Sequence, residues 1–247
     1  MPHTVPLPLF NGCIPLIKGL HLIAHINATH MYHYITYFEI AAFLSSLIAW
    51  GSLRKSPHLR WFPLLLGLVA SVEVYETFFR SKNSFFNTQI YNIQVPLQYL
   101  LYFTILYYAT TRVSYKKLIL TAAILYILVT VTSEIFLTTP NHFNVISYSI
   151  GSLFLIIFIL AKLYEMLQNP TGFNFLKEPF FYILFAFLLF KVGSLPYFAM
   201  SNWLYYVKGY KNTVMMLSNA TSILACILYL TYAIVFVWMT KKRVYSS

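Results

Sequence analysis

Acidic residues and charge in general are scarce in this sequence. Its 247 residues include six acids, and all six are glutamates, because aspartate is absent. The absence of aspartate excludes an aspartyl dyad, a Ser-His-Asp triad and a DxD metal site. Charged residues make up 9% of the chain and hydrophobic residues 59%, whereas a typical soluble domain is roughly 25% charged. This composition cannot supply the charged surface of a soluble fold, so it indicates an integral membrane protein.

Cysteine and histidine exclude further classes of protein. The two cysteines, Cys13 and Cys226, fall in the N-terminal segment and in the last hydrophobic segment, so we expect no structural disulfide. No histidine lies in a hydrophobic segment, which excludes a bis-histidine haem, and no HExxH motif is present. Without a convincing serine or cysteine nucleophile beside a base, we predict that the chain is not an enzyme and that it needs no cofactor.

Seven long hydrophobic segments predict an all-α membrane protein. A hydrocarbon core about 30 Å thick requires roughly 20 apolar residues per helix. The segments cover 34–53, 60–80, 89–110, 117–137, 143–167, 179–200 and 214–239. We therefore expect an external N-terminal segment at 1–33, a seven-helix transmembrane bundle at 34–240 and a basic tail at 241–247. Pro63, Pro96 and Pro196 fall inside three of these segments and predict kinks.

The lysines and arginines are distributed unequally between the two sides of the predicted bundle. One side carries eleven of the 17, the opposite side carries five, and Lys191 lies within a helix. By the positive-inside rule, the N-terminus is outside and the C-terminus cytoplasmic. The net charge of +11 therefore reflects topology and not nucleic-acid binding. We expect a multi-pass protein of a bacterial inner membrane, with the lipid bilayer as its first partner. The eleven are Arg54, Lys55, Arg60, Arg112, Lys116, Lys117, Lys162, Lys177, Lys241, Lys242 and Arg243.

The predicted topology permits a 3+1+3 repeat of helices. Aligning Asn92 with Asn219 places residues 101–104 (LYFT) on residues 228–231 (LYLT) without a gap. Parallel repeats of this kind occur in some transporters. Chance is the alternative, because tyrosine and leucine are so frequent in this chain.

Polar residues within the hydrophobic segments are concentrated in the outer halves of the predicted helices. A transport path would need polar side chains on both sides of the midplane, whereas an outward-facing pocket needs them on one side. An ionisable residue inside a membrane is a site hypothesis by default. The residues that we expect to bind a ligand in such a pocket are Glu39, Glu73, Gln94, Gln98, Lys191 and Asn219.

Lys191 is a positively charged residue well inside one of these hydrophobic segments, and we expect a carboxylate to pair with it. Glu73, at a comparable depth, is the first choice, and Glu39 is the second. The alternative for the uncharged polar residues is a structural role in hydrogen bonds between helices, worth about 0.6 kcal/mol each.

Four histidines, at positions 21, 25, 30 and 33, fall within 13 residues directly before the first hydrophobic segment. Residues 13–29 are predicted to form an amphipathic helix on the outer surface. His21 and His25 are four residues apart, a spacing that can also chelate a metal ion. The surface helix is the preferred reading, because no cysteine or carboxylate lies nearby before Glu39.

Two stretches carry a resemblance to a known group of proteins. They are IYNIQVPLQYLLYF at 90–103 and LKEPFFYILFAFLLF at 176–190, in a chain rich in Phe and Tyr throughout. The sequence resembles small seven-helix bacterial membrane proteins that look like the sensor halves of membrane histidine kinases. The resemblance covers the membrane region and implies a role in signalling.

These observations together predict a sensor or receptor-like membrane protein. It would bind a small ligand from the outer side and signal through a separate cytoplasmic or membrane partner. Two alternatives are a small-solute transporter with 3+1+3 helix repeats and a non-catalytic subunit of a larger membrane complex.

Overall fold

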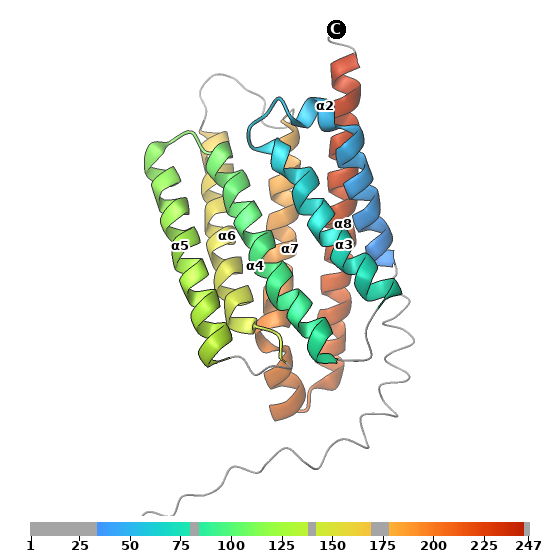
Figure 1. Ribbon diagram of the computed structural model, residues 1–247, viewed down its shortest axis with the longest axis vertical. Coiled ribbons are helices and arrows are strands. Elements are labelled where there is room, and N and C mark those ends of the chain that lie inside the picture. The colour runs from blue at the N-terminus through green and yellow to red at the C-terminus, as the bar shows by residue number, and fades with distance from the viewer. Residues whose placement is uncertain (1–33, 80–83, 138–141, 169–177, 245–247) are drawn as a thin grey trace, which may run out of the picture.

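The computed structural model describes residues 34–79, 84–137, 142–168 and 178–244. In these ranges the regular secondary structure is entirely helical. The long helices stand side by side in one bundle, with the C-terminal end of α8 at the top of the view (Figure 1). The predicted all-helical fold class is therefore confirmed for this part of the chain.

The helices follow one another closely along the chain. The first helix, Tyr34–Ile48, is joined through Ala49 to the short α2. In the helices that follow, a 3-10 turn, η1, precedes α3 and a π-helical turn, η3, follows α7. The bounds are α2 (Trp50–Leu53), η1 (Leu59–Trp61), α3 (Phe62–Phe78), α4 (Ser84–Ala109), α5 (Val113–Phe136), α6 (Val145–Leu167), α7 (Pro179–Asn202), η3 (Trp203–Val207) and α8 (Lys211–Val244).

Five of the described helices are long and apolar enough to cross a membrane. Tyr34–Ile48 is apolar but shorter. α4 has 26 residues and is long enough, but Asn, Thr and Gln side chains make its first half polar. The chain is therefore a helical protein with the composition of a multi-pass membrane protein. The five are Leu59–Phe78, Val113–Phe136, Val145–Leu167, Pro179–Ser201 and Lys211–Lys241.

The seven predicted segments all fall on helices, although some bounds differ. α4 begins at Ser84 and α8 at Lys211, so both start before the predicted positions 89 and 214. Pro63 lies in the first turn of α3 and not in the helix interior. The basis for a kink there was therefore wrong, because proline in a first turn removes an amide that has no helical partner. Pro96 and Pro196 are inside α4 and α7, as predicted.

α4 occupies a central position in the bundle. It contacts α3, α5 and α6, and α7 packs between α6 and α8. In Figure 1, α4 crosses the front of the bundle at an angle to α5 and α6. Side chains on different faces of α4 therefore reach different neighbours, and this is what positions the polar residues discussed below.

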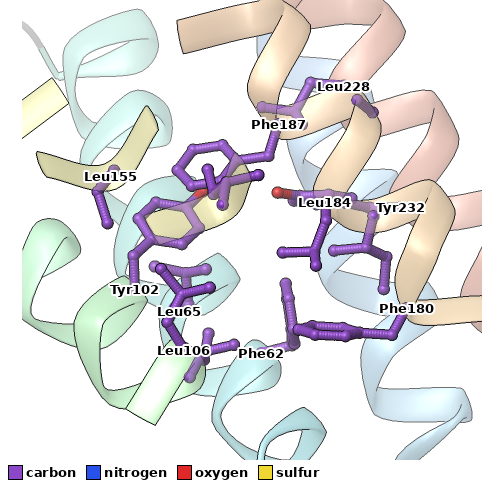
Figure 2. Close-up of a cluster of buried hydrophobic side chains, with 14 of the residues drawn as sticks. Phe62, Leu65, Tyr102, Leu106, Leu155, Phe180, Leu184, Phe187, Leu228 and Tyr232 are labelled. Carbon is purple, nitrogen blue, oxygen red and sulfur yellow. The ribbon is translucent and has the colours of Figure 1, made fainter. Parts of the chain in front are cut away.

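The bundle has two halves of different chemistry. One half surrounds η1, the first turns of α3 and α7, and the C-terminal part of α8, and we call it the apolar half. Figure 2 shows side chains from α3, α4, α6, α7 and α8 converging in its core. Phe62 packs edge-on against Tyr232 and Phe236, with 5.6 Å between ring centroids in both pairs. Such aromatic packing fills the interior of this half.

The opposite half contains the first turns of the first helix, α4, α6 and α8, and the last turns of α3, α5 and α7. We call it the polar half because most buried polar residues of the described chain lie there. Ser46 and Thr110 are buried toward the other end, and each donates to a carbonyl of its own helix. The predicted one-sided polarity is thus present. The buried polar residues of the polar half and of the adjoining middle of the bundle are Thr36, Glu39, Asn87, Asn92, Gln94, Ser133, Asn144, Ser147, Ser152, Lys191, Ser194 and Thr221.

Candidate functional site

Lys191 lies in the middle of α7 and is almost completely buried, with 3% of its surface exposed. Its ammonium donates a hydrogen bond to the Tyr99 hydroxyl of α4 at 2.9 Å. The ammonium also lies 4.3 Å from the centre of the Tyr99 ring and 4.9 Å from that of Tyr148, with Phe187 and Phe190 farther out at 5.6 Å. Aromatic rings attract a cation through their quadrupole. Lys191 therefore sits in an aromatic environment.

The predicted ion pair between Lys191 and Glu73 or Glu39 is not present. The ion pair found among the described residues is a different one, between Lys162 and Glu165, with 3.0 Å between Nζ and Oε2. The prediction failed because similar depth in the membrane does not make two side chains neighbours. Lys191 faces α4 and α6, while Glu73 contacts α4 from the α3 side.

The lysine belongs to a chain of hydroxyl groups that joins α4, α6 and α7. The Tyr99 and Ser152 hydroxyls are 2.6 Å apart, and Tyr99 also lies 3.2 Å from the Tyr148 carbonyl oxygen. The Tyr148 and Ser194 hydroxyls are 2.9 Å apart. These groups are buried and hydrogen-bonded, as stable interiors require. We call Lys191, Tyr99, Tyr148, Ser152 and Ser194 the lysine cluster.

Gly151 of α6 permits this close approach. A Cβ at this position would lie 2.7 Å from a carbon of the Tyr126 ring and 3.1 Å from two carbons of the Tyr99 ring. Both rings are fully buried, so neither has space into which it could move. Glycine is required here to bring Tyr99 against the backbone of α6.

A second cluster contains the carboxylates of Glu39 and Glu73, which interact electrostatically with each other. Glu39 comes from the first helix and Glu73 from α3. Tyr91 of α4 donates a hydrogen bond to Glu73 Oε1 at 3.2 Å, and the hydroxyl of Tyr229 of α8 faces Glu39. Four helices thus converge on two acids. We call Glu39, Glu73, Tyr91 and Tyr229 the carboxylate cluster.

Glu39 is 4% exposed, and its Oε2 atom is buried without a hydrogen-bond partner among the described residues. An unpaired polar atom in an interior costs about 1–3 kcal/mol, and more when it is charged. On α8, Thr221 Oγ1 is also buried and unpaired within the same described part of the chain. Thr221 lies eight residues before Tyr229, and this spacing places both on the same side of the helix. Glu39 Oε2 can take up a proton or accept a hydrogen bond from a ligand or a water, and Thr221 Oγ1 can accept such a hydrogen bond.

The predicted glutamines lie on the α4 face that leads away from the carboxylate cluster. Tyr91, Gln94, Gln98 and Tyr102 follow one another at helical spacings of three, four and four. Gln94 is buried and Gln98 is half-buried. Tyr102 stacks on Phe187 with 3.9 Å between ring centroids, and it interacts electrostatically with both Glu39 and Tyr148. It therefore stands between the two clusters.

The structure does not bring all six predicted residues into one site. Glu39 and Glu73 are together, Gln94 and Gln98 share the adjoining face of α4, and Lys191 belongs to the separate lysine cluster. Asn219 is exposed, as are its neighbours Met216 and Ala220, so the described structure gives it no contact with the other five. His21 and His25 lie outside the described residues. In the described part of the chain, no group of three or more His, Cys or Glu side chains is arranged to hold a metal ion.

A third polar network was not recognised as such in the sequence. Asn92 donates to Glu134 Oε1 and to the His142 carbonyl oxygen, each at 3.2 Å, and accepts from the Asn144 amide at 3.0 Å. Asn144 caps α6 by accepting from the Ser147 amide at 3.0 Å. Its side chain also donates to Glu134 Oε2 at 3.0 Å. Every member has partners, so the network joins α4, α5 and α6 structurally. The signal in the sequence was an asparagine at the start of a hydrophobic segment, the usual position of a helix cap.

Comparisons with protein-family models, with curated proteins and with solved structures found no match to this chain.

Proposed function

We propose that this chain is a receptor-like membrane protein that binds a small ligand in its polar half. The observation that carries the proposal is Glu39 Oε2, a buried carboxylate oxygen without a partner in the described structure, beside a second carboxylate. The structural network around Asn92 and Asn144 satisfies its polar atoms internally, whereas the carboxylate cluster does not. A difference of this kind is expected when a site is completed by a ligand.

The proposed topology has seven membrane spans, with the N-terminus outside and the C-terminus in the cytoplasm of a bacterial cell. It rests on the excess of lysine and arginine at the apolar end of the bundle, where Arg54, Lys55 and Arg60 lie between α2 and α3. In this orientation the carboxylate cluster is near the outer surface. A ligand can then reach it from outside without passing the packed aromatic core of Figure 2.

In this proposal a signal received there is passed to a separate partner. The basic connections at the apolar end, including Arg112, Lys116 and Lys117, are the proposed contact surface for such a partner. The packed apolar half favours a receptor over a transporter, because a transport path needs polar groups through the whole thickness of the membrane. The 3+1+3 repeat is not needed for this function.

The test is a ligand screen on the purified protein in lipid nanodiscs, with the melting temperature as the readout. A ligand of the proposed site stabilises the wild-type protein, because binding to the folded state alone raises stability. The same ligand should fail to stabilise the Glu39→Gln and Glu73→Gln variants. Glu165→Gln is the matched control, because Glu165 pairs with Lys162 at the opposite end.

A hit that stabilises Glu39→Gln, Glu73→Gln and wild type equally would refute the proposed site. Hits that also cross the membrane in proteoliposome uptake assays would replace the receptor function by transport.

A further inference from the structure

We infer that the ligand of the carboxylate cluster is a small organic cation with a primary ammonium group. The inference rests on the proposed function and specifies its ligand class. The first observation is the negative charge of the cluster. Glu39 and Glu73 come from different helices and interact with each other, and a third acid, Glu76, interacts with Glu73. Carboxylates in one buried site repel each other unless a cation or a proton lies between them.

No basic side chain of the described structure supplies that cation. The electrostatic interactions of Glu39 and Glu73 involve each other, Glu76 and tyrosine hydroxyls, and no lysine or arginine. Lys191 is bound to Tyr99 in the lysine cluster, and Lys162 is paired with Glu165. Among the described residues, therefore, none supplies a positive charge to Glu39 and Glu73, and we assign that role to a ligand.

The chemistry of the site favours an ammonium group over a metal ion. The described residues contain no group of three or more His, Cys or Glu side chains placed to bind a metal, and hard cations take six or more oxygen ligands. An ammonium group needs fewer acceptors, since it has three donor hydrogens at most. The unpaired Glu39 Oε2 can accept one, and the unpaired Thr221 Oγ1 can accept another from a ligand that extends along α8.

The surroundings also fit an organic body attached to that ammonium. Tyr91 of α4 brings an aromatic side chain to Glu73, and Tyr229 of α8 brings one to Glu39. Between Thr221 and Tyr229, the buried face of α8 carries the small Ala225. Aromatic side chains stabilise ammonium ligands when the site is dry.

The experiment uses three molecules of similar shape and different charge. Benzylammonium, benzyl alcohol and benzoate are titrated into the full-length protein in nanodiscs, with butylammonium as a second amine. Melting temperature and calorimetric binding are measured at constant ionic strength. We expect the melting temperature to rise with amine concentration and to remain unchanged with benzoate.

The variants locate the effect. Glu39→Gln and Glu73→Gln preserve shape and remove charge, so each should weaken amine binding about tenfold or more, the value of a hydrogen bond to a charged group. Glu165→Gln should bind the amine like the wild type. Thr221→Val should weaken binding less than either glutamine substitution, because it removes a neutral acceptor.

Three results would overturn the inference. Benzyl alcohol or benzoate binding in a Glu39-dependent way, without amine binding, preserves the site and refutes the ligand class. Amine binding that Glu39→Gln does not weaken refutes both the site and the class. If no molecule binds, and Glu39→Gln and Glu73→Gln raise the melting temperature, protons alone neutralise the pair, and neither the ligand class nor the receptor site stands.

Discussion

Replacing Lys191 by methionine separates a structural role of this residue from a functional one. The lysine is 3% exposed, donates to the Tyr99 hydroxyl at 2.9 Å and has no carboxylate partner among the described residues. Burying an ammonium costs several kcal/mol in real proteins. A hydrogen bond that involves a charged group returns about 1.5–3 kcal/mol, and a desolvated cation–π contact about 2 kcal/mol. These contributions offset the cost only in part.

The methionine variant keeps a flexible apolar side chain of similar length in the aromatic environment. Tyr99 also keeps two partners in this variant, Ser152 and the Tyr148 carbonyl oxygen. We therefore expect Lys191→Met to be neutral or to stabilise the protein by up to about 2 kcal/mol, within the range found when buried charges are replaced by apolar residues.

Tyr99→Phe should have the opposite effect. It removes the acceptor that Lys191 uses and the hydroxyl near Ser152, so it should cost about 1–3 kcal/mol. In the Lys191→Met background the same substitution should cost less, because no ammonium is left unpaired. The coupling energy between the two positions should therefore be about 1 kcal/mol or more.

The assay is equilibrium unfolding of the wild type, both single variants and the double variant in mixed micelles, titrated with a denaturing detergent. A loss of more than about 2 kcal/mol in Lys191→Met, with no coupling to Tyr99→Phe, would falsify this reasoning and assign Lys191 to the fold. If Lys191→Met folds normally but no longer responds to a ligand, the residue acts in signalling.

Two other predictions test packing and pH dependence. Gly151→Ala should destabilise the protein by about 1–2 kcal/mol, because its Cβ would press on two fully buried rings and overpacking exceeds the gain in helix propensity. Gly193→Ala should change stability by less than about 0.5 kcal/mol, because its Cβ meets only the mobile end of the Leu224 side chain; melting curves that reverse this order contradict the packing argument. Burial, and then the nearby Lys162, lower the pKa of His58 from 6.5 to about 4, so stability should be full above pH 6.5 and fall by up to about 3 kcal/mol as the pH drops to about 4. His58→Phe, which retains the contact of this ring with Phe180 at 4.6 Å, should melt at a temperature that varies less over this pH range, and an unchanged slope would exclude His58 as its cause.

The helical fold and the one-sided polarity could be predicted from the sequence because each is a property of a single segment. Length and apolar composition define a helix that can cross a membrane, and the position of a residue within its segment gives its depth. Glu39 and Glu73 were both predicted to line the outward-facing pocket in this way, and the structure places them in one cluster. α4 shows the limit of the method, since its polar first half made its start harder to recognise.

Lateral neighbours could not be predicted in the same way, because they depend on how helices pack around one another. Lys191 and Glu73 have similar depth but face different helices, so the expected ion pair was wrong. The partner of Lys191 proved to be a tyrosine, in a chain that contains 21 of them. Nothing in the spacing distinguishes Tyr99 from Tyr102, although one reaches α6 and the other reaches Phe187 of α7.

α4 contributes a residue to each of the two clusters, which gives the proposed receptor a route between them. One face of this helix carries Tyr91 at the carboxylate cluster, and a neighbouring face carries Tyr99 at the lysine cluster. Tyr102 interacts electrostatically with Glu39 on one side and with Tyr148 on the other. A cation bound at Glu39 changes the field at Tyr102, and any rotation of α4 in response also moves Tyr99. Since Tyr99 holds Lys191 of α7, and α7 packs on α8, a ligand bound in the polar half would act on α7 and α8 through α4.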